Sequence, residues 1–361
     1  MTFSSAVSRL PLLLLGMLAL VSGVLAGLAR LAVDVPVFAA AQAGSHGALM
    51  ICGFLGTVIA LERAVALAAS GLSWPFLGPL SAGSGGLALL FGAPLVLTQF
   101  LFIAASAIVT AGSALLFVRQ PAIYLATLTL GALSWLAGNL VWMVAGTLLP
   151  AVPWWLAFLV LTIAGERLEL TRFLPTPQTA RQGFAAIVIG LLGAATLSLW
   201  FEPAGLSLFA LMLVALAAWL LRHDIARQTV RQRGLTRYIA VCLLTGYVWL
   251  AVGGLLGVFG GLVPGNQWRD AALHAILLGF VFAMIFGHAP IIFPAVAKVK
   301  IPYHPAFYLP LALLHLTVFA RIVGDLAPLP VMTQAAAIGN ALTLLAFVLT
   351  ILVQVFSARA R

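Results

Sequence analysis

Long apolar stretches alternate along the chain with short segments that hold most of the charged residues and many of the prolines. A helix that crosses a bilayer needs roughly 20 apolar residues, and twelve stretches come close to or exceed that length. They are 10–31, 40–62, 76–94, 97–118, 122–147, 151–170, 183–200, 204–221, 238–262, 271–294, 305–323 and 334–356. Only Gly92 and Pro94 separate the third stretch from the fourth. The pattern predicts an all-α polytopic membrane protein with about twelve transmembrane helices.

The composition agrees with this fold class and excludes an ordinary soluble domain. Of the 361 residues, 63% are hydrophobic and 7% are charged, and the mean hydropathy is +1.17. Lipid replaces the polar surface that a soluble fold needs, so the bilayer is the expected partner. The net charge of +10 is attributed to cytoplasmic loops and not to nucleic acid. Cys52 and Cys242 lie far apart in apolar segments and form no readable disulfide or zinc pattern.

The distribution of basic residues predicts the orientation. With the N-terminus inside, only three of the 18 Lys and Arg residues fall outside, namely Arg30, Arg269 and Arg321. This bias follows the positive-inside rule, so both termini are expected on the cytoplasmic side of a bacterial inner membrane. The first apolar run, Leu10 to Leu31, is longer than a usual signal-peptide core and is interpreted as an uncleaved first span.

A short motif recurs at the ends of two spans. The pattern I-A-x-E-R covers residues 59–63 and again 163–167. Because the copies are four spans apart, one transmembrane domain over 1–361 could contain three four-helix repeats, at about 1–118, 119–221 and 222–361. The pairs Glu62–Arg63 and Glu166–Arg167 have two interpretations. One is a structural lock at a helix end, in which acid and base bond to each other or to neighbouring carbonyls, and the other is a proton entry point. Their position near the interface favours the lock.

The histidines are the main candidates for chemistry. Four are predicted inside the membrane: His46, His274, His288 and His315. The other two, His223 and His304, are expected at the surface. His46 and His274 lie in the outer halves of two spans that run in the same direction, so their imidazoles could meet at one depth. Two such imidazoles can bind a haem iron from both faces of the ring. When each histidine is taken alone, hydrogen-bonded packing is favoured over metal binding.

Two further residues extend this metal hypothesis. His288 follows His274 by 14 residues, which is about 21 Å along a regular helix, so the two cannot share one metal. His288 could line a different site or bond across to a neighbouring helix. On an α-helix turning about 100° per residue the two histidines would point to nearly the same side. Met50 follows His46 by four residues and would lie on the same helix face. A histidine with a thioether suits Cu(I), although methionine is also a common filler of apolar gaps.

The segment "SHGALM" on the second span, together with a tenth-span histidine near the outer side, resembles subunit I of haem-copper oxidases. That resemblance implies three arcs of four helices, with His46 and His274 as the axial ligands of a b-type haem. The sixth and seventh spans lack the histidines that hold copper in those oxidases. Oxygen reduction is therefore not expected.

The late stretch "LHAILLGFVFAMIFGHAPIIFPAV" is similar to a segment of the NnrS-like family, in the positions His274, Gly279, Met284, Gly287 and His288. That family's early histidine motif is matched in part by His46, Gly47 and Met50. The resemblance implies a haem-binding inner-membrane protein of the nitric oxide or redox stress response, with copper as a second candidate metal.

Two other functions fit the same sequence. Proton-coupled secondary transport would suit the number of spans, the repeats, and Pro290 and Pro294, which free backbone carbonyls. A structural or assembly subunit of a membrane complex would use the histidines only for packing, and a redox partner or larger complex could then bind the chain. Enzymatic activity is left open.

Aromatic residues inside the spans also have two interpretations. Trp135, Asn139 and Trp142 share one helix face, and Tyr247 and Trp249 lie on the ninth span. They could flank a porphyrin, but a role in holding helices together is favoured.

Overall fold

The computed structural model describes residues 6–171 and 177–359, which form helices and, within those ranges, no β-strand. In these described ranges, eleven helices are long and apolar enough to cross a membrane. They are Arg9–Ala29, Ala43–Ala68, Leu95–Arg119, Ile123–Ala145, Leu149–Thr171, Gln178–Leu197, Glu202–His223, Gly234–Gly261, Arg269–Ala297, Pro305–Leu326 and Pro330–Ala358. The prediction of an all-α polytopic membrane protein is confirmed. Arg172 and Arg361, both assigned to the inner side, lie outside the described residues.

The predicted third span, 76–94, differs from the others in length. It is a 3₁₀ turn, Trp74–Phe76, followed by α5, Leu77–Leu90, which has only 14 residues. Such a helix rises about 21 Å, which is less than the roughly 30 Å of a hydrocarbon core. Its glycines allow close packing: a Cβ on Gly83 would lie 2.6 Å from Leu15 Cβ, and one on Gly85 would lie 2.9 Å from Phe102 Cε1.

The chain divides into two compact units. One contains Met1–Thr162 and Ile292–Lys298, and the other contains Ile163–Ile291 and Val299–Arg361. These boundaries do not coincide with those of the predicted four-helix repeats, which remain a prediction.

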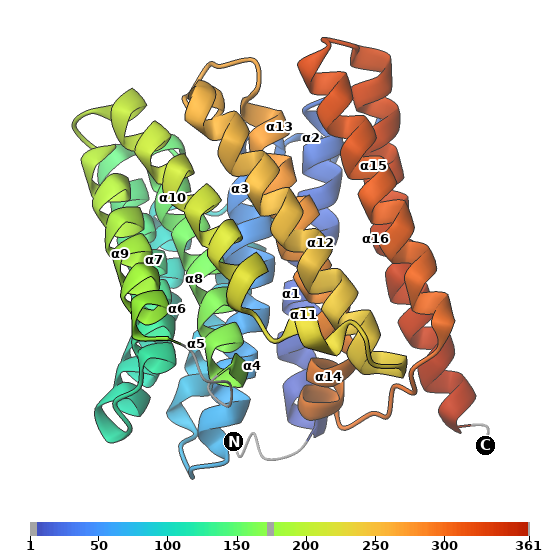
Figure 1. Ribbon diagram of the computed structural model, residues 1–361. Helices are drawn as coiled ribbons and strands as arrows, with labels where there is room; N and C mark the ends of the chain where they lie inside the picture. Colours follow the sequence, from blue (N-terminus) through green and yellow to red (C-terminus); the bar gives the residue numbers. More distant parts are fainter. Residues whose placement is uncertain (1–5, 172–176, 360–361) are drawn as a thin grey trace. The chain divides into compact units, whose positions relative to one another are not determined.

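The first unit is built on α1, which packs against the segment that begins with His46 (Figure 1). That segment consists of α3, His46–Ala48, then a π-helix, Leu49–Leu55, and then α4. The main helices are α1 (Ala6–Ala29), α4 (Gly56–Ala68), α5, α6 (Leu95–Arg119), α7 (Ile123–Ala145) and the start of α8 (Val152–Thr171).

The second unit contains two helical hairpins, α9–α10 and α15–α16, and the short helix α11 joins α10 to α12 (Figure 1). The helices are α9 (Gln178–Leu197), α10 (Glu202–His223), α11 (Ala226–Thr229), α12 (Gly234–Leu256), α13 (Arg269–His274), α14 (Ala283–Ala297, partly in the first unit), α15 (Tyr308–Leu326) and α16 (Pro330–Arg359). A π-helix, Ala275–Phe282, lies between α13 and α14.

Both candidate haem ligands therefore lie just before a π-helix. His46 opens the three-residue α3 that precedes Leu49–Leu55, and His274 directly precedes Ala275–Phe282. A π-helix carries extra residues in a turn and often marks a functional site. It also changes which residues share a face. The inference that His274 and His288 point to nearly the same side assumed a regular α-helix, and that assumption was wrong.

Replacing Gly56 by alanine is expected to destabilise the first unit. The new Cβ would come closer to Trp135 Cζ2 than real Cβ contacts allow. Trp135 is fully buried and stacks on Phe158 at 4.9 Å between ring centroids, so it has little room to move. Overpacking of this kind typically costs about 1–3 kcal/mol, and we expect a lower thermal midpoint for the purified protein.

Gly47→Ala, in the same predicted span, is the matched control because a Cβ there meets no atom within 4 Å. Alanine should be neutral or slightly stabilising at that position because of its helix propensity. Equal midpoints for the two variants would contradict the tight contact at Gly56.

Candidate functional site

In the first unit, the His46 ring lies directly against α1. Its Nδ1 is 2.7 Å from the carbonyl oxygen of Gly23, and a Cβ on Gly27 would lie 2.7 Å from its Cε1. A carbonyl oxygen can only accept, so Nδ1 donates and the lone pair of the neutral ring is on Nε2. The absence of side chains at Gly23 and Gly27 allows this approach. Met50 contacts α1 as well, since a Cβ on Gly23 would lie 2.7 Å from its Sδ.

In the second unit, His274 has the same tautomer. Its Nδ1 is 2.8 Å from the backbone oxygen of Asp270, and 3.7 Å from the carboxylate Oδ2 of that residue. The Asp270 carboxylate also binds Arg321, and Arg321 Nε lies 3.1 Å from Oδ2 of Asp325. Thr333 Oγ1 donates to Asp325 Oδ1 at 3.1 Å. A metal-ligating histidine typically donates its other ring N–H to a carbonyl or carboxylate that is itself hydrogen-bonded. Nδ1 of His274 has partners of this kind.

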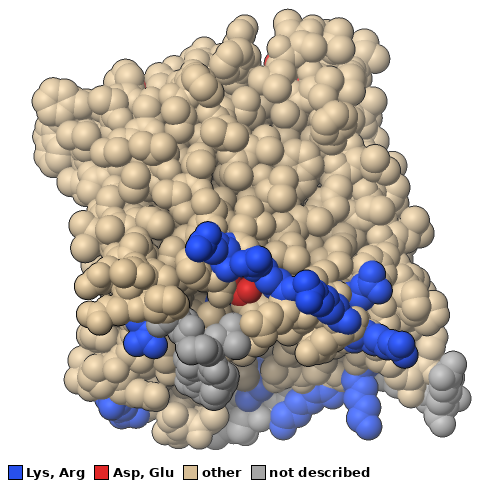
Figure 2. Space-filling view, in the orientation of Figure 1, with Lys and Arg blue, Asp and Glu red and all other residues tan. Residues whose placement is uncertain are grey.

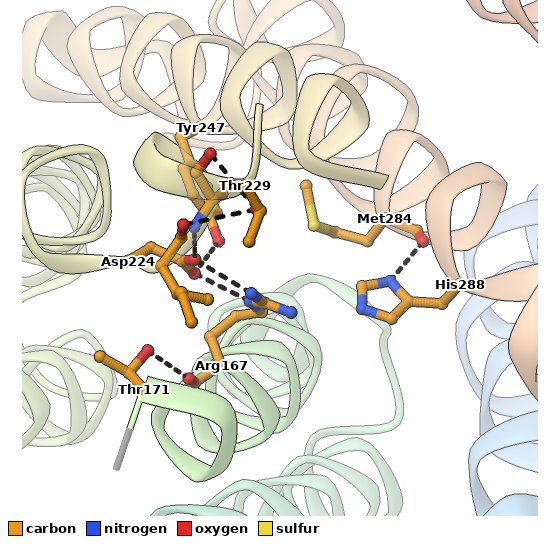
Figure 3. Close-up of polar contacts among 9 residues, drawn as sticks. Arg167, Thr171, Asp224, Thr229, Tyr247, Met284 and His288 are labelled. Atoms are coloured by element: carbon orange, nitrogen blue, oxygen red, sulfur yellow. Dashed lines mark hydrogen bonds and ion pairs between the residues drawn. The ribbon is translucent and has the colours of Figure 1, made fainter. Parts of the chain in front are cut away.

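The other two intramembrane histidines differ from each other. His288 donates from Nδ1 to the carbonyl oxygen of Met284 at 2.7 Å (Figure 3), which again places the lone pair on Nε2. At His315 the roles are reversed, because Trp249 Nε1 donates to Nδ1 at 3.0 Å. The neutral His315 ring therefore carries its proton on Nε2, which is buried and has no acceptor among the described residues. Three of the four rings can thus offer Nε2 to a metal in their present tautomer, and His315 cannot.

The described ranges contain no group of three or more His, Cys, Asp and Glu residues that could hold a metal ion. A haem needs only two imidazoles, so this finding leaves the haem hypothesis open. His46 belongs to the first unit and His274 to the second, and each is described within its own unit. Their pairing across one haem, and the binding of copper by His46 and Met50, remain predictions.

The two Glu-Arg motifs are not equivalent in the structure. Arg63 Nη2 lies 3.6 Å from Glu62 Oε1, and both side chains are partly exposed. Arg167 instead pairs with Asp224, with Nε 2.8 Å from Oδ2 and Nη2 3.0 Å from Oδ1 (Figure 3). The expectation that Arg167 would bond to its neighbour Glu166 or to nearby carbonyls missed this partner. Asp224 is the sole acid in the arginine-rich segment "LRHDIARQTVRQR". This isolated acid was the sequence feature that could have indicated a partner for Arg167.

Four donors satisfy the Asp224 carboxylate. Besides the two from Arg167, Tyr247 Oη donates to Oδ2 at 2.6 Å, and the backbone N–H of Ala226 donates to Oδ1 at 2.7 Å. The Asp224 side chain has no exposed surface and that of Arg167 has 4%. A carboxylate that accepts from four donors is typical of a structural ion pair. The lock interpretation of the Glu166–Arg167 pair itself remains a prediction.

A second polar cluster, in the first unit, is centred on Asn139. Its Oδ1 accepts from Trp155 Nε1 at 3.0 Å and from Cys52 Sγ at 3.4 Å. Its Nδ2 donates to the carbonyl oxygen of Phe102 at 2.9 Å and to Ser106 Oγ at 3.1 Å. Trp135, one turn earlier on the same face, donates to Cys52 Sγ at 3.4 Å. These contacts hold helices together, which was the favoured interpretation of the aromatic face of α7.

We expect Asn139→Leu to destabilise the protein by about 1–3 kcal/mol, since it leaves the buried indole N–H of Trp155 without its acceptor. The free energy of unfolding in detergent is the measurement. Thr196→Val is the control, because Thr196 is exposed and its hydroxyl donates to the carbonyl oxygen of Leu192 in its own helix, at 2.8 Å. A loss for Asn139→Leu no larger than that of the control would contradict the assigned role.

Comparison with known proteins places the chain in a family. No curated protein matches the chain, and no solved structure matches it. The model of the family described as "Domain of unknown function (DUF8744)" matches residues 9–356. Because this match covers nearly the whole chain, the protein belongs to the DUF8744 family.

Proposed function

We propose that the chain is a haem-binding integral membrane protein in which Nε2 of His46 and Nε2 of His274 ligate the iron of a b-type haem. The observation that carries the proposal is the hydrogen bond from Nδ1 of each ring to a backbone carbonyl, at 2.7 Å for His46 and 2.8 Å for His274. An axial imidazole must be neutral with its lone pair toward the iron. A carbonyl that accepts from Nδ1 fixes that tautomer and the direction of the ring.

Two further features support the proposal. Both histidines are closely followed by a π-helix, a geometry that often accompanies functional sites. Behind His274, the carboxylate of Asp270 is itself held by Arg321. A carboxylate close to Nδ1 raises the basicity of a ligating imidazole, and an arginine that fixes this carboxylate keeps it in place.

The biological role follows from the resemblance to the NnrS-like family and is part of the same proposal. The protein would act in nitric oxide or redox stress at the bacterial inner membrane. Placing both termini in the cytoplasm requires the short helix α5 to complete a twelfth crossing. Copper is a second possible metal. His46 and Met50 both contact α1, and the tautomer of His288 also suits a metal.

Proton-coupled transport is the weaker alternative. It needs a buried carboxylate that can exchange partners or take up a proton. Asp224 is buried with four donors, and Asp325 is held by Arg321 and Thr333. Each carboxylate is held by several donors, so neither is placed to exchange partners.

The test is an absorption spectrum of the purified protein in detergent, oxidised and then reduced with dithionite, after expression with added haem precursor. We expect a Soret band, and sharp α and β bands on reduction, as two axial imidazoles produce. Membranes from cells with an empty vector, taken through the same purification, are the control. Absence of Soret absorption after haem supplementation would refute the proposal and leave the structural-subunit interpretation.

A further inference from the structure

Five arginines form an exposed band at one end of the second unit. They lie at the end of α10, on α11, in the turn between α11 and α12, and in the first turn of α12. They are Arg222, Arg227, Arg231, Arg233 and Arg237, and all five are exposed. Figure 2 shows Lys and Arg side chains gathered in a band over this part of the chain, below a large surface without Lys or Arg. We call these five residues the arginine band.

No exposed acid offsets the arginine band within its own segment. Asp224 is the one acid between residues 222 and 237, and its side chain is fully buried against Arg167. The charge of this carboxylate is thus neutralised inside the unit. The exposed part of the segment carries five positive charges and no negative one.

The same aspartate holds the connecting segment in a defined conformation. Its Oδ1 accepts from the N–H of Ala226 at the start of α11, and its Oδ2 accepts from Tyr247 on α12. Arg227 Nη1 also donates to the carbonyl oxygen of Arg222 at 2.8 Å. Asp224 and its partners therefore hold the segment that carries the arginines (Figure 3). A segment that is already ordered loses less entropy when a ligand binds.

We propose that the arginine band binds the phosphate headgroups of anionic lipids. Helices α10 and α12 both have the length and composition of membrane spans, so their joined ends lie at the level of the headgroups. Clusters of four to eight basic residues next to a span are typical of anionic-lipid binding. All five residues are arginine, whose planar fork binds phosphate oxygens in pairs. The proposal is independent of haem binding.

The test uses the full chain reconstituted in bilayers with spin-labelled phosphatidylglycerol or phosphatidylcholine. The ratio of the two lipids immobilised at the protein surface is measured at low and at high salt. The variant is Arg227→Gln/Arg231→Gln/Arg233→Gln, which leaves Asp224 and both spans intact. We expect wild type to prefer phosphatidylglycerol. Each arginine near the surface changes the preference by about fivefold at low salt, which is about 1 kcal/mol, and by less at high salt.

The matched control removes three exposed arginines from separate places, as Arg30→Gln/Arg119→Gln/Arg181→Gln. This control lowers the net charge as much as the triple variant of the arginine band does. An equal loss of lipid preference in the two variants would show a net-charge effect and overturn the proposal. Wild type without preference for the anionic lipid would overturn it in favour of an acidic protein partner. Inorganic phosphate that displaces the lipid better than chloride of equal ionic strength would assign the site to free phosphate. Gel filtration and circular dichroism check that each variant is folded.

Discussion

Replacing His274 by alanine is expected to abolish the low-spin haem spectrum, and His46→Ala should do the same. Each variant removes one of the two proposed axial imidazoles, so the iron becomes five-coordinate and high-spin or the haem is lost. Since each imidazole contributes a direct bond to iron, loss of the sharp α and β bands should be complete and not partial. The measurement is the reduced absorption spectrum, with the haem-to-protein ratio determined in parallel.

Two controls separate ligation from folding. His304→Ala removes an exposed histidine whose Nδ1 accepts from the backbone N–H of Ala306 at 3.1 Å, and it should keep the wild-type spectrum. His274→Gly leaves a gap into which free imidazole can bind. Added imidazole should restore the low-spin bands if His274 ligates the iron, and it cannot repair a purely structural loss. A low-spin spectrum that persists in both His46→Ala and His274→Ala would contradict the assignment.

The span pattern could be predicted from the sequence because it depends only on length and hydrophobicity, and lipid requires both. The prediction failed in length at α5, which has only 14 residues. Its glycines and alanines do not lower the mean hydropathy of the segment enough to exclude a span. In the structure, the glycines allow close packing against Leu15 and Phe102. The π-helices after His46 and His274 could not be predicted, since the extra residue in the turn has no compositional signature.

The candidate histidines could be chosen from the sequence, but their chemistry could not. Whether a ring offers Nδ1 or Nε2 depends on its partner. The partner is Gly23 for His46, on another helix, and Trp249 for His315, 66 residues away. Likewise, Arg167 and Asp224 are 57 residues apart. The motif around Arg167 suggested a local partner in Glu166, and only the fold brings the distant carboxylate to the guanidinium.

Removing the Asp224 carboxylate is expected to destabilise the protein more than any other change in the second unit described above. Asp224→Ala leaves the Arg167 guanidinium, 4% exposed, without its counter-charge, and it leaves Tyr247 Oη and the Ala226 N–H without their acceptor. Breaking one partner of a buried pair costs about 3–5 kcal/mol. The free energy of unfolding, measured by titration of mixed micelles with dodecyl sulfate, should fall by an amount in that range.

The double variant Arg167→Met/Asp224→Leu distinguishes an unpaired charge from a general loss of packing. It removes both charges, so we expect it to be more stable than Asp224→Ala alone, and a double-mutant cycle should show strong coupling. The matched control is the other copy of the motif, where Glu62→Ala breaks a partly exposed pair 3.6 Å apart and should cost at most about 1 kcal/mol. Additive losses at Arg167 and Asp224, or equal losses at the two copies, would contradict the structural lock.

Because the arginine band is displayed from the segment that Asp224 holds, Asp224→Ala should also weaken the preference for anionic lipid, although all five arginines remain.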